Sequence, residues 1–303
     1  MKIVEITGGL GNQMFQYSLM LALRNAFPDE AVKGDLLPYR AYKLHNGFEL
    51  ERVFGIRIDA ASPEEVAKLK VAFSSYLLSR CYRRLPAFFQ KRSTCNEAPE
   101  MTYDPSVLTV SGDRYFSGYW QNHEYFDAVA AEVRAAFAFP PHRDVRNREL
   151  EERLTGDPGA VAVHVRRGDY VKNPLFRGIC SESYFRNALG ALPEARSGYR
   201  FFVFSDDREW CRAKLLPMLN GAAATLVDWN EGPESFRDMQ LMGCCRSMIL
   251  ANSSFSWWGA YLNRHADPVV LAPAKWLNRY PDFSPPLPRW RKVPVGQEGE
   301  IDL

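Results

Sequence analysis

Residues 161–170 read Val-Ala-Val-His-Val-Arg-Arg-Gly-Asp-Tyr. The first half is apolar and β-branched, as expected of a strand that is buried on both faces. Charged side chains then gather where the strand ends, at His164, Arg166, Arg167 and Asp169. Two adjacent arginines in such a place are costly to bury unless an anion pairs with them. Because ligands bind at this end of the strands in an open α/β sheet, the stretch predicts a phosphate site.

Strand and helix patterns alternate through the second half of the chain. Strands are expected at 161–165, 199–204, 224–228, 247–251 and 269–272, and helices at 183–192, 208–218, 235–245 and up to residue 262. Regular alternation of this kind predicts a parallel sheet. All strands of a parallel sheet end at the same edge, so the polar clusters that follow them are expected to lie together.

The first half begins in a similar way but is less regular. A strand at 3–6, a glycine loop and a helix at 13–26 open the chain, and further patterns indicate helices at 62–78 and 123–137 and a strand at 114–120. Prolines and polar residues at 138–150 indicate a linker. A length of 303 residues fits two domains, which we place at residues 1–145 and 146–303.

Two more polar clusters follow strands of the second half. They are Ser205-Asp206-Asp207 and Asn252-Ser253-Ser254-Phe255-Ser256, and the latter opens a helix. Hydroxyl and N–H groups at a helix start can hold a phosphate, although serine there can also be a plain N-cap. Aspartates can bind magnesium, but a carboxylate can instead accept hydrogen bonds from guanine, with His164 on the base or ribose. Arginines that neutralise a diphosphate make a metal unnecessary.

Only one of the two arginines is expected to face the phosphate, because alternate side chains of an extended segment point in opposite directions. The other arginine would then pair with a carboxylate, for which Asp169 is the candidate.

The glycine loop and the aromatic turn of the first half each allow two interpretations. Residues 7–12 read Thr-Gly-Gly-Leu-Gly-Asn and match neither Gly-x-Gly-x-x-Gly nor a P-loop. The loop is either a tight turn or part of a functional surface whose polar face is made by Asn12, Gln13 and Gln16. Residues 118–122 read Gly-Tyr-Trp-Gln-Asn. Trp120 and Gln121 would bind a sugar by stacking and hydrogen bonding, or else the aromatic rings belong to the core.

Composition excludes some classes of protein. A formal net charge of only +2 argues against a nucleic-acid partner. Six cysteines without Cys-x-x-Cys spacing predict reduced thiols, neither a zinc site nor a disulfide framework. No signal peptide or membrane-spanning run is apparent. We therefore expect a cytoplasmic protein, and the basic residues from Arg80 to Arg92 form either a solvated helix face or a contact with the inner face of an anionic membrane.

The sequence resembles bacterial α-1,2-fucosyltransferases and the wider superfamily that includes α-1,6- and protein O-fucosyltransferases. The matching blocks are residues 8–17, 118–121, 164–170, 204–207 and 251–260, in the expected order. The resemblance implies an α/β fold of the GT-B-like type, with two Rossmann-like domains whose parallel sheets face a cleft. It also implies transfer of fucose from GDP-β-L-fucose, with inversion and no obligatory metal, to the 2-hydroxyl of a terminal galactose, as in lactose. GDP-fucose is then a co-substrate, and no cofactor is expected.

The resemblance also implies roles for individual residues. Arg166 would bind the β-phosphate, His164 and Asp207 or Asp206 the guanosine, and residues 254–256 the diphosphate. The complete donor set also includes Arg167, Ser205, Asn252 and Ser253. Catalysis would rest on Arg166, Asp169 and Asn12, with Asp169 either the general base or the carboxylate that orients Arg167. The acceptor set is Gly11, Asn12, Gln13, Trp120 and Gln121. The alternatives are another GDP-sugar-dependent glycosyltransferase or a non-catalytic carbohydrate-binding protein. The missing Gly-Lys-Ser/Thr disfavours a kinase.

Overall fold

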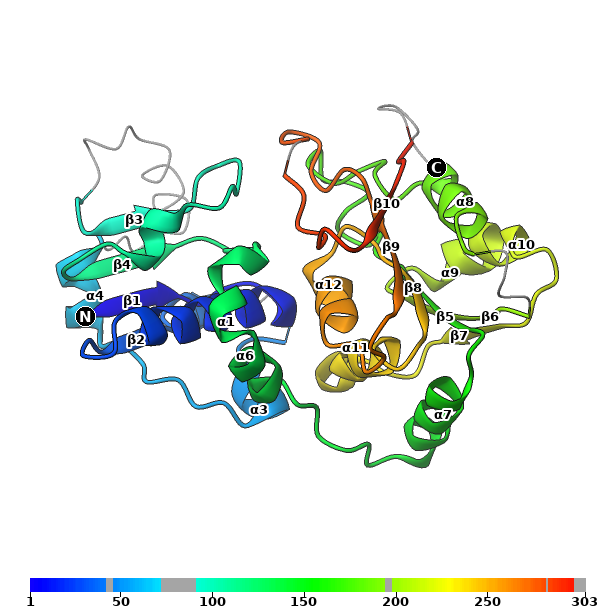
Figure 1. Cartoon of the computed structure of the whole chain (residues 1–303), viewed down its shortest axis with the longest axis horizontal. Coiled ribbons are helices and arrows are strands. Elements are labelled where there is room, and N and C mark those ends of the chain that lie inside the picture. The colour runs from blue at the N-terminus through cyan, green and yellow to red at the C-terminus, as the bar shows by residue number, and fades with distance from the viewer. Residues whose placement is uncertain (42–45, 72–90, 194–197, 282, 297–303) are drawn as a thin grey trace. The chain divides into compact units, whose positions relative to one another are not determined.

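The computed structural model describes residues 1–41, 46–71, 91–193, 198–281 and 283–296. The chain divides into two compact units, Met1–Pro140 and Pro141–Leu303, and the division falls within the segment in which we expected a linker. Each unit is built on a parallel sheet (Figure 1). The predicted α/β class, with two Rossmann-like units, is confirmed. Most of the basic run from Arg80 to Arg92 lies outside the described residues.

Among the described residues, the sheet of the first unit contains four parallel strands. They are β1 (Lys2–Glu5), β2 (Val32–Asp35), β3 (Thr94–Asn96) and β4 (Arg114–Ser117), in the order β2-β1-β4-β3. The chain passes from β1 to β2 on one side, and the later strands lie on the other side. The strand order therefore reverses between β1 and β4, and ligands bind at such switch points in α/β sheets.

Helices and turns surround this sheet. Helix α1 (Leu10–Ala26) follows β1 and is buried over most of its surface, which explains its apolar sequence. The others are α2 (Pro38–Ala41), α3 (Leu50–Phe54), α4 (Pro63–Leu69) and α6 (Ala130–Ala136), with 3₁₀ turns η2 (Pro105–Leu108), η3 (His123–Tyr125) and η4 (Asp127–Val129). A capping box of Ser62 and Glu65 starts α4. The continuous helix expected at 123–137 is wrong, because two 3₁₀ turns precede α6.

In the part of the second unit that the structure describes, six parallel strands form a sheet in the order β10-β9-β8-β5-β6-β7. Its strands are β5 (Ala160–Val165), β6 (Arg200–Ser205), β7 (Ala224–Val227), β8 (Ser247–Ile249), β9 (Val269–Pro273) and β10 (Arg291–Val293). The five strands predicted in this half are confirmed. The order reverses between β5 and β8, so the loop after residue 165 lies beside the loop after residue 249.

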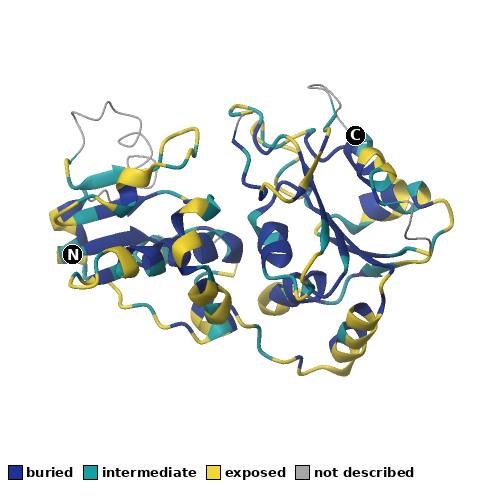
Figure 2. Ribbon diagram, viewed as in Figure 1, coloured by how far each residue is buried: buried dark blue, intermediate teal, exposed yellow. Residues whose placement is uncertain are grey.

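Helices cover this sheet, with α8 to α10 on one side and α11 and α12 on the other (Figure 1). The helices are α7 (Val145–Gly156), α8 (Glu182–Gly190), α9 (Arg208–Trp210), α10 (Leu216–Met218), α11 (Phe236–Met242) and α12 (Ser254–Tyr261). A π-helical turn, η5 (Cys211–Leu215), joins α9 to α10, and a 3₁₀ turn, η6 (Gly232–Glu234), precedes α11. The central strands are buried (Figure 2), and Val161, Val163 and Val165 pack against Tyr184 and Phe185.

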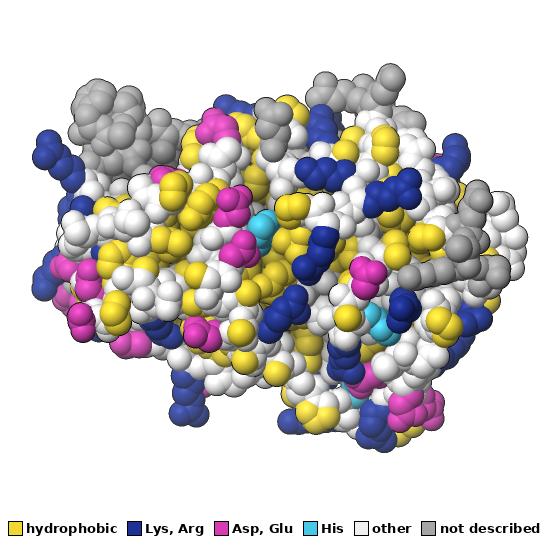
Figure 3. Space-filling view, viewed as in Figure 1, with side chains coloured by type: hydrophobic (Ala, Val, Ile, Leu, Met, Phe, Trp, Pro, Cys, Tyr) yellow, Lys and Arg dark blue, Asp and Glu magenta, His cyan; other side chains and the backbone are white. Residues whose placement is uncertain are grey.

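Surface properties add little to these features. Acidic and basic side chains are interspersed on the face shown in Figure 3. Within the described part of the chain, no helix is both long and apolar enough to span a membrane. The five cysteines in that part are free thiols, and four of them are buried.

Candidate functional site

The loops after β5, β6 and β8 form the candidate site of the second unit. Because β5 pairs with both β6 and β8, the three loops leave one edge of the sheet side by side. The first two loops are directly bonded, since the backbone N–H of Arg167 donates to Asp206 Oδ1 at 2.8 Å. Three clusters that lie far apart in the sequence are thereby brought together, as the parallel sheet predicted.

Arg166 lies between two carboxylates. Its Nη2 is 2.7 Å from Asp169 Oδ1, and its Nη1 is 2.9 Å from Asp206 Oδ2. Burial alone would lower the pKa of this guanidinium, but Asp206 and Asp169 outweigh that effect and raise the pKa. The side chain keeps 28% of its surface exposed. A permanently charged fork at the end of β5 is therefore within reach of an anionic ligand.

Arg167 has a different environment. Its Nε donates to Asp207 Oδ2 at 3.1 Å, its guanidinium lies 4.4 Å from the centre of the Trp210 ring, and its side chain is 10% exposed. The prediction that Arg167 pairs with Asp169 is wrong, because Asp169 pairs with Arg166. The expected division of roles between an exposed and a supporting arginine fits this placement, with Asp207 as the supporting carboxylate.

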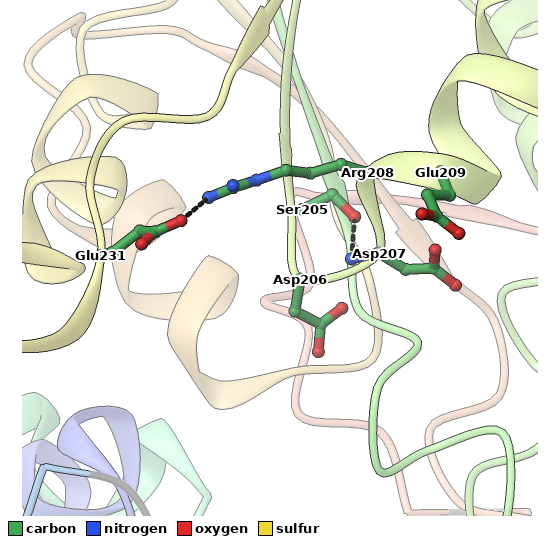
Figure 4. Close-up of a pocket in the computed structure, with 6 residues that line it drawn as sticks. All are labelled: Ser205, Asp206, Asp207, Arg208, Glu209 and Glu231. Atoms are coloured by element: carbon green, nitrogen blue, oxygen red, sulfur yellow. Dashed lines mark hydrogen bonds and ion pairs between the residues drawn. The ribbon is translucent and has the colours of Figure 1, made fainter.

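A cavity of about 400 Å³ opens beside this cluster (Figure 4). Asp207 Oδ1 accepts a hydrogen bond from the Trp210 N–H, and Ser205 Oγ accepts one from the Asp207 N–H, so both residues also fix the start of α9. The Arg208 guanidinium lies 2.7 Å from Glu231. The lining residues are Ser205, Asp206, Asp207, Arg208, Glu209 and Glu231. Sequence reasoning missed the last three, although two directly follow the aspartates.

His164 lies within β5 and is almost fully buried, with 6% of its surface exposed. Its ring is 5.8 Å from that of Phe255 at the start of α12, and its Nδ1 has no hydrogen-bond partner among the described residues. Burial, with a smaller effect of Arg166, lowers the pKa of His164 to about 3. The imidazole is therefore neutral near pH 7 and can act as a hydrogen-bonding group without adding positive charge.

Acid is expected to destabilise the protein through His164. Below pH 6.5 the imidazole of His164 takes up a proton in the unfolded chain, whereas in the folded chain it stays neutral down to about pH 3. The free energy of unfolding therefore falls as the pH falls. Between pH 7 and pH 5 this group alone should remove about 2 kcal/mol. Urea unfolding of the wild type and His164→Gln at both pH values measures the difference. Equal losses in the two proteins would contradict the assignment.

The polar run before α12 separates into two groups. Ser254 and Phe255 are partly exposed, whereas Ser256 is fully buried and donates to the carbonyls of Ala251 and Ser253. Ser253 caps the helix by accepting from the Phe255 N–H. Ser256 is therefore a structural residue, and its predicted contact with a diphosphate does not fit this placement. Ser254 and the first N–H groups of α12 are better placed for an anion.

Asn252 is also committed to protein atoms. Its Nδ2 donates to the Trp276 carbonyl at 3.0 Å, and its Oδ1 accepts from Cys180 Sγ at 3.3 Å. The buried Trp257 anchors the helix that follows, because its Nε1 donates to the Pro285 carbonyl and its ring stacks on Tyr261. Asn252 thus positions the loop and does not face a ligand.

In the first unit, Gln13 does not have its predicted role. Its side chain is fully buried, donates to the carbonyls of Gly8 and Gly47, and accepts from the Glu49 N–H. An amide used in this way holds the glycine loop and is not available to a sugar. Gly11 is buried as well. The sequence could not show this, because Gln13 and Gly47 are brought together only by folding.

Asn12 and Gln121 meet at the switch point of the same sheet. Gln121 Nε2 donates to Asn12 Oδ1 at 2.8 Å, and both residues are partly exposed. Trp120 is only 1% exposed and packs edge-on against Tyr125, so the expectation that its ring stacks on a sugar does not fit. The neighbouring Tyr119 is 38% exposed. The sequence alone did not settle the conformation of the turn, which exposes the Tyr119 ring and buries that of Trp120.

Comparison with known proteins identifies the family to which the chain belongs. The model of glycosyl transferase family 11 matches residues 73–283. Alpha-1,2-colitosyltransferase of Escherichia coli is 33% identical over 96% of this chain and 98% of that protein. Galactoside alpha-(1,2)-fucosyltransferase 1 of Saimiri sciureus is 26% identical over 88% and 66%. A solved structure of NodZ alpha-1,6-fucosyltransferase soaked with GDP-fucose is 14% identical, with a TM-score of 0.49 over 92% of this chain and 96% of that chain. The chain therefore belongs to glycosyl transferase family 11, the α-1,2-fucosyltransferase family.

Proposed function

We propose that this glycosyltransferase moves L-fucose from GDP-β-L-fucose to the 2-hydroxyl of a terminal galactose in a glycan. Family membership supports the transfer of a sugar of this kind, and relatives named as α-1,2-fucosyltransferases support the linkage. The observation that carries the donor assignment is the position of Arg166. Its guanidinium lies at the switch point of the sheet, beside the start of the helix α12, which follows the neighbouring strand β8. A nucleoside diphosphate is the ligand class that this combination suits.

The second unit would stabilise the leaving group. As the bond between the anomeric carbon and the diphosphate oxygen breaks, negative charge grows on GDP. The Arg166 fork and the N–H groups at the start of α12 would meet this charge, which is electrostatic stabilisation of the departing group. The cavity lined by Asp206 and Asp207 would take the nucleoside, with the neutral His164 nearby. No metal is assigned to any of these steps.

The acceptor 2-hydroxyl would attack the anomeric carbon from the face opposite GDP, so a β-linked donor gives an α-linked product. The new bond joins this oxygen to the anomeric carbon, GDP leaves with the bonding electrons, and the hydroxyl proton passes to solvent water. Asp169 is bonded to Arg166, which suits it to orienting the guanidinium. Asn12, on the first unit, would position the hydroxyl. A dissociative, oxocarbenium-like transition state would need no strong base.

The proposal predicts a specific product. With GDP-fucose and lactose, the enzyme should form an α-1,2-linked fucosyl-lactose, and EDTA should leave the rate within about twofold if no metal supplies transition-state charge. Product linkage and anomeric configuration are read by NMR. GDP-mannose is the matched control donor, since it offers the same nucleotide with a different sugar. Transfer from GDP-mannose at a rate equal to that from GDP-fucose, or a retained β-linkage, would contradict the assignment.

A second candidate is transfer of colitose, because the colitosyltransferase shares 33% identity over nearly the whole chain. Colitose is fucose without its 3-hydroxyl. A site that hydrogen-bonds this hydroxyl rejects the deoxy sugar by up to roughly 10⁴-fold, whereas a site that lacks such a contact discriminates far less. The ratio of kcat/KM for the two GDP-sugars therefore decides between the candidates.

We also propose that the enzyme works in the cytoplasm, at the inner face of the membrane, on free or lipid-linked glycans. A relative named O-antigen biosynthesis glycosyltransferase WbnK, 28% identical over 90% of this chain, supports a role in glycan assembly. Co-sedimentation with anionic vesicles tests the membrane contact.

A further inference from the structure

Glu97 holds the turn at 118–121 of the first unit through hydrogen bonds of both its backbone and its side chain. It directly follows β3, and its backbone N–H donates to the Ser117 carbonyl at 2.9 Å. Its carboxylate accepts from the backbone N–H of Tyr119 at 2.7 Å, through Oε2, and from that of Trp120 at 2.8 Å, through Oε1. One side chain thus holds two consecutive backbone donors, which is a strong constraint on the conformation of the turn.

The turn needs this support because its backbone is unusual. Trp120 has φ of +58°, a conformation that is unfavourable for a bulky residue with a β-carbon. Gly118 packs so closely on Glu97 that a β-carbon there would lie 2.4 Å from Cβ of Glu97. The absence of a side chain at Gly118 therefore leaves room for Glu97, and Glu97 in turn stabilises Trp120 in its unfavourable backbone conformation.

The conformation of the turn decides which groups are displayed. It directs the Trp120 ring into the core, where the ring packs on Phe116 and Tyr125, and it leaves Tyr119 38% exposed. Gln121 donates to Asn12, and Gln16 of α1 donates to the Gly118 carbonyl. The turn and the start of α1 are therefore tied together at the point where the strand order reverses between β1 and β4.

We propose that Glu97 is a positioning residue of the acceptor site, which holds the turn at 118–121 so that the Tyr119 ring stacks on the acceptor sugar beside Asn12 and Gln121. This inference rests on the proposed function and names the part of the first unit that recognises the glycan. An aromatic ring offers its face to the apolar side of a pyranose, and two amides take the hydroxyls. Glu97 itself does not touch the sugar.

The charge on Glu97 matters for this role. The ionised carboxylate accepts through both oxygens, whereas a protonated carboxyl turns one oxygen into a donor that faces a backbone N–H. Burial raises the pKa of Glu97 to about 7, and the N–H groups of the turn partly oppose this rise. Tyr125 of η3 interacts electrostatically with Glu97, and its own pKa, raised to about 12 mainly by burial, keeps it neutral in this range. Acceptor binding should therefore weaken as the pH falls through about 7.

The test compares Glu97→Gln and Tyr119→Ala with the wild type, using GDP-fucose and lactose. Each change should raise the KM for lactose by about tenfold and leave the KM for GDP-fucose within about twofold. Glu97 acts through the turn that carries Tyr119. The double variant should therefore raise the KM for lactose little more than the more damaging of the two single changes does. Glu97→Asp should give an intermediate KM. The exposed Glu100, three residues further on, provides the control Glu100→Gln, which should behave as wild type.

Direct binding separates this inference from the proposed function. Saturation-transfer NMR with lactose in the presence of GDP should show binding to the wild type that weakens from pH 8 to pH 6, and weak, pH-independent binding to Glu97→Gln. A wild type that neither binds lactose nor transfers fucose would overturn the proposed function. A wild type that does both, with an unchanged lactose KM in Glu97→Gln or additive losses in the double variant, would overturn the inference alone. If Glu97→Gln fails to fold, an unchanged lactose KM in Tyr119→Ala overturns it.

Discussion

Replacing Arg166 with alanine is expected to lower kcat by about 10³-fold while leaving the fold intact. The guanidinium would stabilise charge that develops only as GDP departs, so its loss should appear mainly in kcat. The folded protein should tolerate the change, because Asp169 and Asp206 keep substantial exposure of 60% and 26% and can be solvated. Single-turnover kinetics with GDP-fucose, together with a thermal melt, measure both effects.

Two further variants sharpen this test. Arg166→Lys keeps the charge but loses the two-pronged contact with a phosphate, so its rate should lie between those of the wild type and Arg166→Ala. Arg212, which pairs with Asp228 and is 55% exposed, provides the control Arg212→Ala with near-normal turnover. Turnover by Arg166→Ala within tenfold of the wild type would remove Arg166 from the proposed mechanism.

Replacing the adjacent Arg167 with alanine should have the opposite result. The change leaves the Asp207 carboxylate without its guanidinium and removes the contact with Trp210. Breaking a buried pair from one side costs about 3–5 kcal/mol, and the 31% exposure of Asp207 reduces the expected loss to about 2–3 kcal/mol. For a unit of this size that corresponds to a fall in Tm of roughly 5–10 °C.

Calorimetry and kinetics together separate the two arginines. Arg167→Ala, assayed well below its Tm, should retain kcat within about tenfold, because its guanidinium pairs with Asp207 and lies against the Trp210 ring. An unchanged Tm combined with lost turnover would show that Arg167 binds the donor directly. Arg167, and not the more exposed Arg166, would then be the arginine that binds the phosphate.

Much of the fold could be predicted from the sequence where the pattern is strong. The alternation after residue 160 identified the strands from β5 to β9 because each is a short run that is mostly apolar and lies between helix patterns. β2, β3 and β10 were missed, since Val-Lys-Gly-Asp, Thr-Cys-Asn and Arg-Lys-Val carry little apolar signal and form strands only by pairing with better neighbours. The first half of α7 was assigned to the linker, although Asp144 caps that helix by accepting from the Asn147 N–H.

The candidate site could be predicted as a set of clusters but not residue by residue. The clusters lie together because parallel strands end at the same edge of a sheet, and this does not depend on the contacts of their side chains. Which members face a ligand depends on contacts between distant parts of the chain, such as Gln13 with Gly47 or Asn252 with Trp276. The glutamate that holds the aromatic turn has no local signal at all, because its partners lie more than twenty residues away.

The pairing of β5 with β8 also bears on how the protein folds. Val161 aligns with Ser247, so the two loops that would hold the diphosphate become neighbours only after the intervening β6 and β7 segment has been accommodated. Contacts between such distant residues form slowly, because the chain between them must first lose much of its freedom. Binding of GDP would therefore report that β5 and β8 have paired. A ligand that binds only the completed sheet would also stabilise the native state against unfolding.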